Sequence, residues 1–460
     1  MFYSTRKNLG QQIRHFKQTF LQRHDLPFDD LLTTEEITHF IEQSGFVRDR
    51  VFTALVTLKA FISQVLSEDG SCKLTVSRLL TERLQRGLKP NTVNTGPYCK
   101  ARRRLPLAPI IEMVKGIGKR LHQSSAPAWK WKGHNVMLAD GTTVLMPDTA
   151  HNQSEFPQQR NQKPGLGFPI ARIVGLISLS SGSMTAYALG PYQGKGTGES
   201  SLFSQLLDSL TAGDLLLADC YYATYAIVAL TQRKAVNVLF KNHANRQADF
   251  RLGRKLGAKD HLIQWKKPPR KPVWMSKEAY ADLPEVLLVR ELRVDGVVYM
   301  TSLTDARKYR KKEIAELYRE RWQVELDIRS IKTHMRMEML RCKTPENVRK
   351  EIAVHFLAYN LIRAALARSA KLCGKVPRQL SFKTAVQLIN SASSDFFWFS
   401  PNRRKEVSIS LLKSMAQTLV GQQKRKNQPR AIKRRPKPYP LLTEPRPVAC
   451  GRLNTQRAIT

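Results

Sequence analysis

The sequence reads Leu215-Leu-Leu-Ala-Asp219 near its middle, a run of four apolar residues that ends in a carboxylate. The same arrangement occurs upstream, in Asn135-Val-Met-Leu-Ala-Asp140. Short apolar runs of this kind predict buried strands. Three more strands are expected at residues 170–178, 184–189 and 236–240, with helices at 199–210 and 222–232. Because strands and helices alternate, the sequence predicts an α/β fold with a mixed sheet.

Other patterns flank this α/β layer, which is expected over residues 129–242 and 306–390. Residues 1–128 have the apolar spacing of short helices and predict an N-terminal helical domain. Residues 243–305 break the alternation and contain an Asp-Gly hairpin signal, so they predict a β-rich insertion. Residues 391–460 form a basic, proline-rich C-terminal region.

The charge of the chain indicates a polyanionic partner. Lysine and arginine total 76 against 37 acidic residues, which gives a net charge of +39. Such a chain favours nucleic acid, because neutralising phosphates releases counterions, although anionic lipid or RNA bound without catalysis is an alternative. Lys100, Arg102, Arg103 and Arg104 form a basic cluster within residues 1–128. We therefore interpret these helices as a DNA-binding domain, with a solvated helical face as the alternative.

Cysteine spacing and hydropathy argue against several classes of protein. The six cysteines are scattered singly and form no C-x-x-C pair, so neither a zinc site nor a disulfide framework is indicated. No apolar stretch approaches the roughly eighteen residues of a membrane span, and the first residues do not resemble a signal peptide. We expect a protein with reduced thiols and no membrane partner, located in the cytoplasm at the bacterial nucleoid.

Asp140 and Asp219 both follow predicted strands, where loops open and water reaches the end of an α/β sheet. A carboxylate there can hold a metal ion without being buried, whereas the alternative is that each aspartate only caps the following turn. Asp214 precedes its apolar run and Asp148 lies in a polar loop, so both are weaker candidates. Glu199 begins a predicted helix and is interpreted as an N-terminal charge favoured by the helix dipole.

A long polar helix is expected over residues 311–339, and one of its faces combines a carboxylate, two cations and a phenol. At about 100° per residue, Tyr318, Arg321, Glu325 and Lys332 fall within an arc of roughly 60°. A neighbouring apolar stripe should pack on the sheet. The alternative is a solvated helix on which these charges form surface ion pairs.

Glu320 and Asp327 point roughly away from this face, so Glu325 is the helix carboxylate that can join the two aspartates. Transfer at a phosphodiester spreads negative charge over several oxygens. Two Mg²⁺ ions about 4 Å apart can activate the nucleophile and stabilise the leaving oxygen, and Mn²⁺ can substitute. Asp140, Asp219 and Glu325 are therefore the candidate catalytic and metal-binding residues.

A family resemblance lies in the run Tyr318-x2-Arg321-x3-Glu325-x6-Lys332. It resembles the Tyr-Arg-Glu-Lys signature of the insertion sequence 4 family, which are cut-and-paste DDE transposases. Asp140-Gly-Thr and Leu-Leu-Ala-Asp219 resemble the first and second aspartate motifs of that family. The basic run that begins at Lys433 also resembles endings seen in it.

The resemblance implies a ribonuclease-H-like catalytic core that is interrupted by a β insertion between the second aspartate and the glutamate. It further implies a homodimer that binds terminal inverted repeats in a synaptic complex, cuts through a DNA hairpin and joins the ends to target DNA. Tyr318, Arg321 and Lys332 would be DNA-binding residues that hold phosphates near the cut.

Several roles stay open. Family members can use an aromatic residue of the insertion to hold a flipped base, and Trp265, Trp274 and Tyr299 are candidates without an assignment. Two other functions also remain open: a related metal-dependent nuclease or resolvase without strand transfer, and a non-catalytic nucleic-acid-binding protein.

Overall fold

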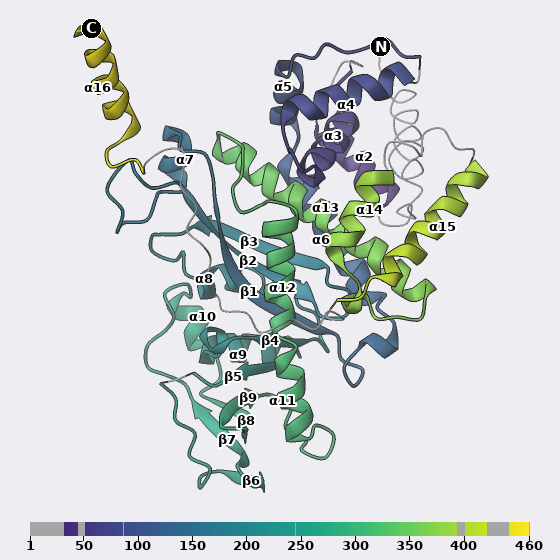
Figure 1. Cartoon of the computed structure of the whole chain (residues 1–460). Helices are drawn as coiled ribbons and strands as arrows, with labels where there is room; N and C mark the ends of the chain where they lie inside the picture. Colours follow the sequence, from purple (N-terminus) through teal and green to yellow (C-terminus); the bar gives the residue numbers. More distant parts are fainter. Residues whose placement is uncertain are drawn as a thin grey trace, which may run out of the picture.

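The computed structural model describes residues 32–44, 51–85, 87–243, 245–392, 401–420 and 441–459. Figure 1 shows a central sheet with helices packed on it, the N-terminal helices at one end of the molecule and the strands of residues 254–301 at the other. Across those ranges, none of the helices has both the length and the apolar character needed to cross a bilayer. The basic run from Lys433 lies outside the described residues.

Within the described residues, nine strands form one sheet in the order β3-β2-β1-β4-β5-β9-β8-β7-β6. They are β1 (Val136–Leu145), β2 (Ile170–Ser178), β3 (Met184–Pro191), β4 (Leu215–Ala218), β5 (Asn237–Lys241), β6 (Arg254–Gly257), β7 (Asp260–Lys266), β8 (Val286–Val294) and β9 (Val297–Thr301). Strand β4 runs parallel to β1 and β5, and the other pairings are antiparallel. The predicted mixed sheet is confirmed.

The α-helices of the described residues fall into three groups along the chain. Before the sheet come α2 (Thr34–Gln43), α3 (Ala54–Leu66), α4 (Cys72–Gln85), α5 (Gly96–Arg104) and α6 (Leu107–Gln123). Between strands lie α7 (Ala150–Glu155), α8 (Glu199–Ser204), α9 (Tyr225–Arg233) and α10 (Lys277–Ala281). After the sheet follow α11 (Lys311–Arg319), α12 (Trp322–Arg329), α13 (Pro345–Leu372), α14 (Phe382–Ala392), α15 (Pro401–Gln417) and α16 (Arg446–Ile459).

The two faces of β1 contribute to different hydrophobic cores. Leu138 packs into the core that includes α13, whereas Ala139 packs into the core that includes α8 and α9. Because side chains alternate along a strand, Asp140 follows on the α13 side and Gly141 on the α8 side. Helix α12 packs on β1 from the same side as α13, so Asp140 faces the helix that carries Glu325.

Strand β1 is longer than predicted, and Asp140 lies inside it rather than at its end. The strand continues to Leu145, where it forms a bridge with Met339. Its parallel neighbour β4 ends at Ala218, and their last paired residues are Leu138 and Leu217. From Asp140 onward, β1 therefore has no ladder on the β4 side, and the opening expected at a strand end is produced by the shorter neighbour.

The single long helix predicted over residues 311–339 is wrong in detail. Helix α11 ends at Arg319, α12 begins at Trp322, and a wider turn over Ser330–His334 follows. The chain then returns to the sheet, where the Leu145 N–H donates to the Glu338 carbonyl oxygen at 3.0 Å. Apolar periodicity continues across both interruptions, so it could not reveal them.

The stretch 243–305 does contain the predicted hairpin, with β8 and β9 joined through Asp295 and Gly296, both at positive φ. It also contains β6, β7 and α10, which apolar patterning did not indicate. These strands extend the central sheet, because β9 pairs with β5 through Leu239 and Thr301. Strand β6 is largely exposed, and an edge strand of this kind has no buried face to produce an apolar pattern.

Candidate active site

Asp140 is half-buried at the opening beside β4. The backbone N–H of Gly141 donates to its Oδ1 at 2.8 Å. Burial raises the pKa of the Asp140 carboxyl to about 6, with Arg321 lowering it and the neighbouring carboxylates of Glu199 and Asp219 raising it. Asp140 therefore lies within electrostatic reach of two further acids and one cation.

Asp219 follows β4 directly and begins a short turn. Its Oδ1 accepts a hydrogen bond from the Tyr221 N–H at 2.8 Å, so it caps the turn over Cys220–Tyr222. The capping alternative considered from the sequence is thus real, but it engages one carboxylate oxygen. The other oxygen remains available for a ligand, and capping and metal binding are compatible.

Glu325 lies on α12 and is held by an arginine on the same face. Arg321 Nη2 donates to Glu325 Oε1 at 2.9 Å. Asp140, Glu325 and Lys332 line one open hollow of about 350 Å³. The structure therefore brings Glu325 and Lys332, predicted to share a helix face, against the strand that carries Asp140.

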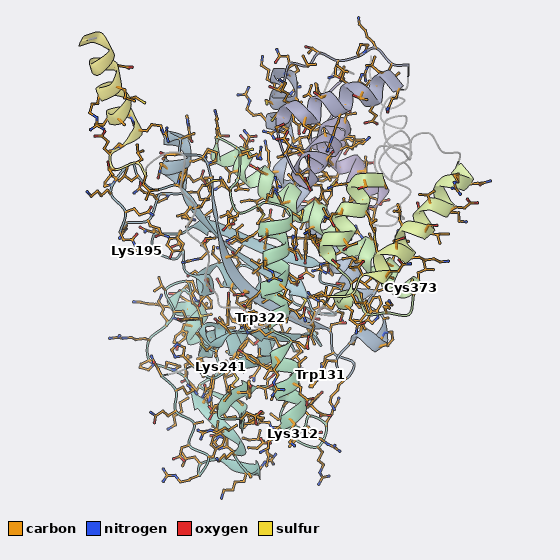
Figure 2. All side chains as sticks on the ribbon, viewed as in Figure 1. Trp131, Lys195, Lys241, Lys312, Trp322 and Cys373 are labelled. Carbon is orange, nitrogen blue, oxygen red and sulfur yellow. The ribbon has the colours of Figure 1, made fainter. Side chains whose placement is uncertain are left out.

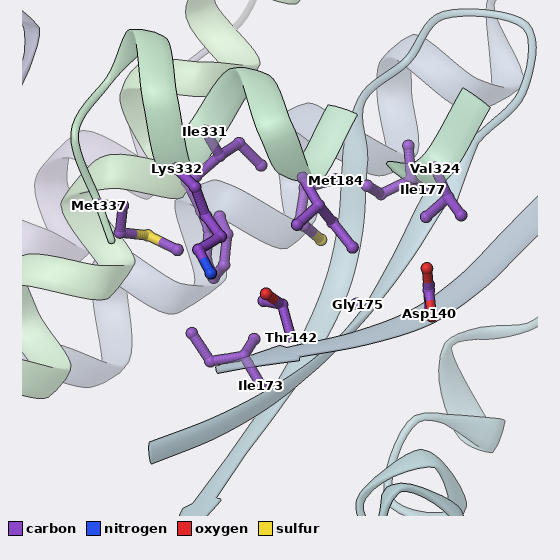
Figure 3. A pocket seen from close by; sticks show the side chains of 12 residues that line it. Asp140, Thr142, Ile173, Gly175, Ile177, Met184, Val324, Ile331, Lys332 and Met337 are labelled. Carbon is purple, nitrogen blue, oxygen red and sulfur yellow. The ribbon is translucent and has the colours of Figure 1, made fainter. Parts of the chain in front are cut away.

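Figure 3 shows Lys332 reaching from the helical segment toward β1, with Thr142 and Asp140 on the strand below it. Lys332 Nζ lies 3.9 Å from a carboxylate oxygen of Glu338, a contact at the limit of an ion pair. Its amine remains partly exposed at the hollow. It can therefore exchange this weak contact for a phosphate.

Tyr318 completes the predicted helix stripe from the end of α11. Its ring packs on Tyr299, with 5.1 Å between ring centroids. Burial raises the pKa of the Tyr318 hydroxyl to about 12, and Asp219 is among the charges that act on it. Tyr318 thus lies within electrostatic reach of Asp219, with its hydroxyl protonated at neutral pH.

The donor set fits a hard divalent cation. Asp140, Asp219 and Glu325 offer carboxylate oxygens, which Mg²⁺ and Mn²⁺ prefer. Among the residues that the structure describes, no group of three or more acidic, histidine or cysteine side chains is arranged to hold a metal ion. The ion pair with Arg321 engages Glu325, so this carboxylate must turn away from the arginine before all three can share a cation.

Two residues that lie at the site were not predicted from the sequence. Glu199 does begin α8, as expected, yet its carboxyl also lies against Gly141 and interacts with Asp140 and Asp219. The buried Tyr222 hydroxyl faces the same carboxylates. No sequence pattern indicates that either residue belongs to the site, apart from the position of Tyr222 three residues after Asp219.

The weaker acidic candidates lie elsewhere. Asp148 is exposed in the loop after β1, and Asp214 is buried at the start of β4 beside His122. Asp327 is fully buried and pairs with Arg363 and Arg378. It anchors α12 to the helices behind it, and it does not line the hollow.

Of the three aromatic candidates of the insertion, two are buried, and Trp274 is partly buried against the core that includes α8 and α9. Trp265 and Tyr299 are buried, and Arg246 stacks 3.6 Å from the Trp265 ring centroid. By contrast, Trp322 on α12 and Tyr221 after Asp219 are 57% and 63% exposed. Figure 2 shows Trp322 on the central helix of the molecule.

The predicted basic cluster on α5 does not form one exposed patch, because Arg102 packs on the Phe61 ring.

The chain is similar to known transposases. The model of the family described as "Transposase DDE domain" matches residues 131–361, about half of the chain, and this range includes Asp140, Asp219 and Glu325. The chain is 28% identical over 421 residues to transposase InsG for insertion sequence element IS4 of Escherichia coli (strain K12). That alignment covers 89% of this chain and 92% of the relative.

One solved structure is also similar, a chain of the piggyBac transposase synaptic complex with hairpin DNA. The TM-score is 0.43 at 11% sequence identity, over 85% of this chain and 84% of that chain.

Proposed function

Because this chain belongs to the insertion sequence 4 family of DDE transposases, we propose that Asp140, Asp219 and Glu325 form its catalytic site. They hold two divalent cations, Mg²⁺ or in its place Mn²⁺. The enzyme cleaves DNA at the ends of its element, through a DNA hairpin, and joins the released ends to target DNA. This is cut-and-paste transposition.

One observation carries the proposal. Asp140 and Glu325 line the same open hollow, although 185 positions separate them in the chain (325 minus 140). Asp219 acts electrostatically on Asp140 from the end of the neighbouring strand. Like charges placed together raise the free energy of the folded chain unless a cation joins them. A solvated helix with surface ion pairs does not require this convergence.

The residues around the carboxylates have different roles in binding DNA. Bound cations supply Lewis-acid stabilisation of charge on the phosphate oxygens. Arg321 pairs with Glu325 and acts electrostatically on Asp140, so it reduces the repulsion of these two acids. Lys332 provides an ammonium group for a phosphate, and the protonated Tyr318 hydroxyl donates a hydrogen bond to a phosphate oxygen.

We also propose a division of the chain. Residues 129–242 and 306–390 form a ribonuclease-H-like core, which is supported by one mixed sheet covered by helices on both faces. Residues 243–305 are an insertion that lengthens this sheet. Residues 1–128 bind DNA, supported by the exposed Lys100 and Arg103 on α5. The basic C-terminal region, residues 391–460, adds phosphate contacts.

The proposed DNA partners are terminal inverted repeats and a target duplex, brought together by a homodimer. The net charge of +39 supports the binding of several DNA segments. A dimer lets each protomer act on one end of the element, since the two ends carry related sequences in opposite orientation.

The test compares DNA binding with metal-dependent cleavage on a duplex that carries the element's own flanking DNA. Glu325→Ala and Asp219→Asn should keep DNA binding, measured by gel shift, and lose cleavage in Mg²⁺. Glu320→Ala is the matched control, because Glu320 is an exposed glutamate in the turn between α11 and α12. Full cleavage by both site variants would overturn the assignment of this site.

A second assay separates transposase from nuclease. A precleaved end incubated with plasmid DNA should be joined to it by the wild-type protein. Cleavage without joining would favour the nuclease reading, and salt-sensitive binding without any cleavage would favour a non-catalytic protein.

A further inference from the structure

Glu199 approaches the acidic site from the opposite face of the sheet. A Cβ atom placed on Gly141 would lie 2.6 Å from the carboxyl carbon of Glu199 and 2.7 Å from its Oε1. A side chain at this position would push the Glu199 carboxyl aside, so the glycine after Asp140 admits that carboxyl directly against β1. The contact brings an acid from α8 to the strand position next to the first catalytic candidate.

Charges of both signs act on Glu199. Burial raises the pKa of the Glu199 carboxyl, Arg172 opposes this effect and Asp219 adds to it. Arg172 is partly committed elsewhere, since its Nη1 donates to the Thr197 carbonyl oxygen at 2.8 Å and its guanidinium stacks on the Tyr192 ring. Glu199, Asp140 and Asp219 therefore form a group of three acids on which two cations act, Arg172 on Glu199 and Arg321 on Asp140.

A buried polar atom points to a ligand at this group. Tyr222 is fully buried, and its hydroxyl lies against the Glu199 carboxyl and lowers the pKa of that carboxyl, yet it makes no well-directed hydrogen bond to any residue that the structure describes. The hydroxyl faces Glu199, Asp140 and Asp219, whose charges raise its pKa in addition to the effect of burial. A buried hydroxyl without a well-directed hydrogen bond is unfavourable, so a water or another oxygen beside it and the carboxylates is expected.

We propose that Glu199 is a fourth carboxylate of the metal site and helps to hold the divalent cation that Asp140 and Asp219 bind. Tyr222 orients a water in the same space. The inference rests on the proposed function, because it presupposes a cation at these aspartates. It adds to that function a residue from α8, which lies outside the Tyr-Arg-Glu-Lys helix and both aspartate motifs.

The test measures Mn²⁺ binding to the full chain without DNA, from the loss of the free-ion electron paramagnetic resonance signal. Glu199→Gln keeps the shape of the side chain and removes its charge. Its affinity for Mn²⁺ should fall about tenfold, or about 1.4 kcal/mol. Glu278→Gln is the matched control, an exposed acid in the first turn of another short helix, and should bind Mn²⁺ like the wild type.

Tyr222→Phe provides a second variant that preserves the fold, because the ring keeps its edge-on contact with Phe203, with 5.0 Å between the ring centroids. Its Mn²⁺ affinity should fall about threefold, whereas a purely structural tyrosine would leave the affinity unchanged. Wild-type affinity in both Glu199→Gln and Tyr222→Phe, together with loss of binding in Asp219→Asn, would overturn the role of Glu199 and leave the proposed function intact. Equal binding by wild type and Asp219→Asn would overturn both.

Discussion

Replacing Asp140 with asparagine should stabilise the metal-free protein at neutral pH. Burial raises the pKa of the Asp140 carboxyl from 3.8 to about 6, and nearby Glu199 and Asp219 act in the same direction. Asparagine removes the charge and keeps an oxygen for the Gly141 N–H. A site built to bind cations is thus expected to be a source of instability when the cations are removed.

The sign and size of this difference in stability follow from proton linkage. Below about pH 3 both folded and unfolded chains bind the proton, so the carboxyl contributes no difference in stability. As the pH rises the unfolded chain loses this proton first, so the free energy of unfolding falls until about pH 6 and is then constant. At about 1.36 kcal/mol per pH unit, the interval between 3.8 and about 6 amounts to roughly 3 kcal/mol.

Urea unfolding in EDTA, followed by tryptophan fluorescence, measures this difference. The free energy of unfolding of Asp140→Asn should exceed that of the wild type by roughly 1 kcal/mol at pH 4.5 and roughly 3 kcal/mol at pH 8. Asp148→Asn, in the exposed loop after β1, should differ by less than about 0.5 kcal/mol at either pH. An Asp140→Asn protein that is equal to or less stable than wild type at pH 8 would refute the reasoning.

Two further predictions concern the helix that carries Glu325 and the groups beside it. Asp327→Ala should lower the free energy of unfolding by about 3–5 kcal/mol, because it leaves Arg363 buried without its partner; a loss below about 1 kcal/mol in urea unfolding would contradict this. Lys332→Ala should weaken binding to all DNA sequences alike and reduce the slope of log affinity against log salt by about one. An unchanged slope in fluorescence anisotropy would show that Lys332 does not bind a phosphate.

The central strands could be predicted because buried strands consist mainly of apolar residues. Leu215 to Ala218 are fully buried and wholly apolar, so a short run identifies the strand. Strand β6 has no such signal, because its residues are largely exposed at the sheet edge. The length of β1 could not be predicted either, since Val144 alone is fully buried among the residues from Asp140 to Leu145, and they show no clear apolar pattern.

The candidate site could be predicted to the extent that it follows local geometry. Helical spacing places Arg321 beside Glu325, and the structure shows their ion pair. The position of Glu199 could not be predicted from local geometry. Its contact with Gly141 depends on how the chain folds back after β3, and no periodicity in the sequence reports the distance between α8 and β1.

The most direct test of the account is a crystal structure of the protein with Mn²⁺ and a DNA end, with Mn²⁺ located by anomalous scattering. The account predicts anomalous density in contact with Asp140, Asp219 and Glu325, with Glu325 turned away from Arg321. Density bound only at other residues, or none at Mn²⁺ concentrations that support cleavage, would contradict it.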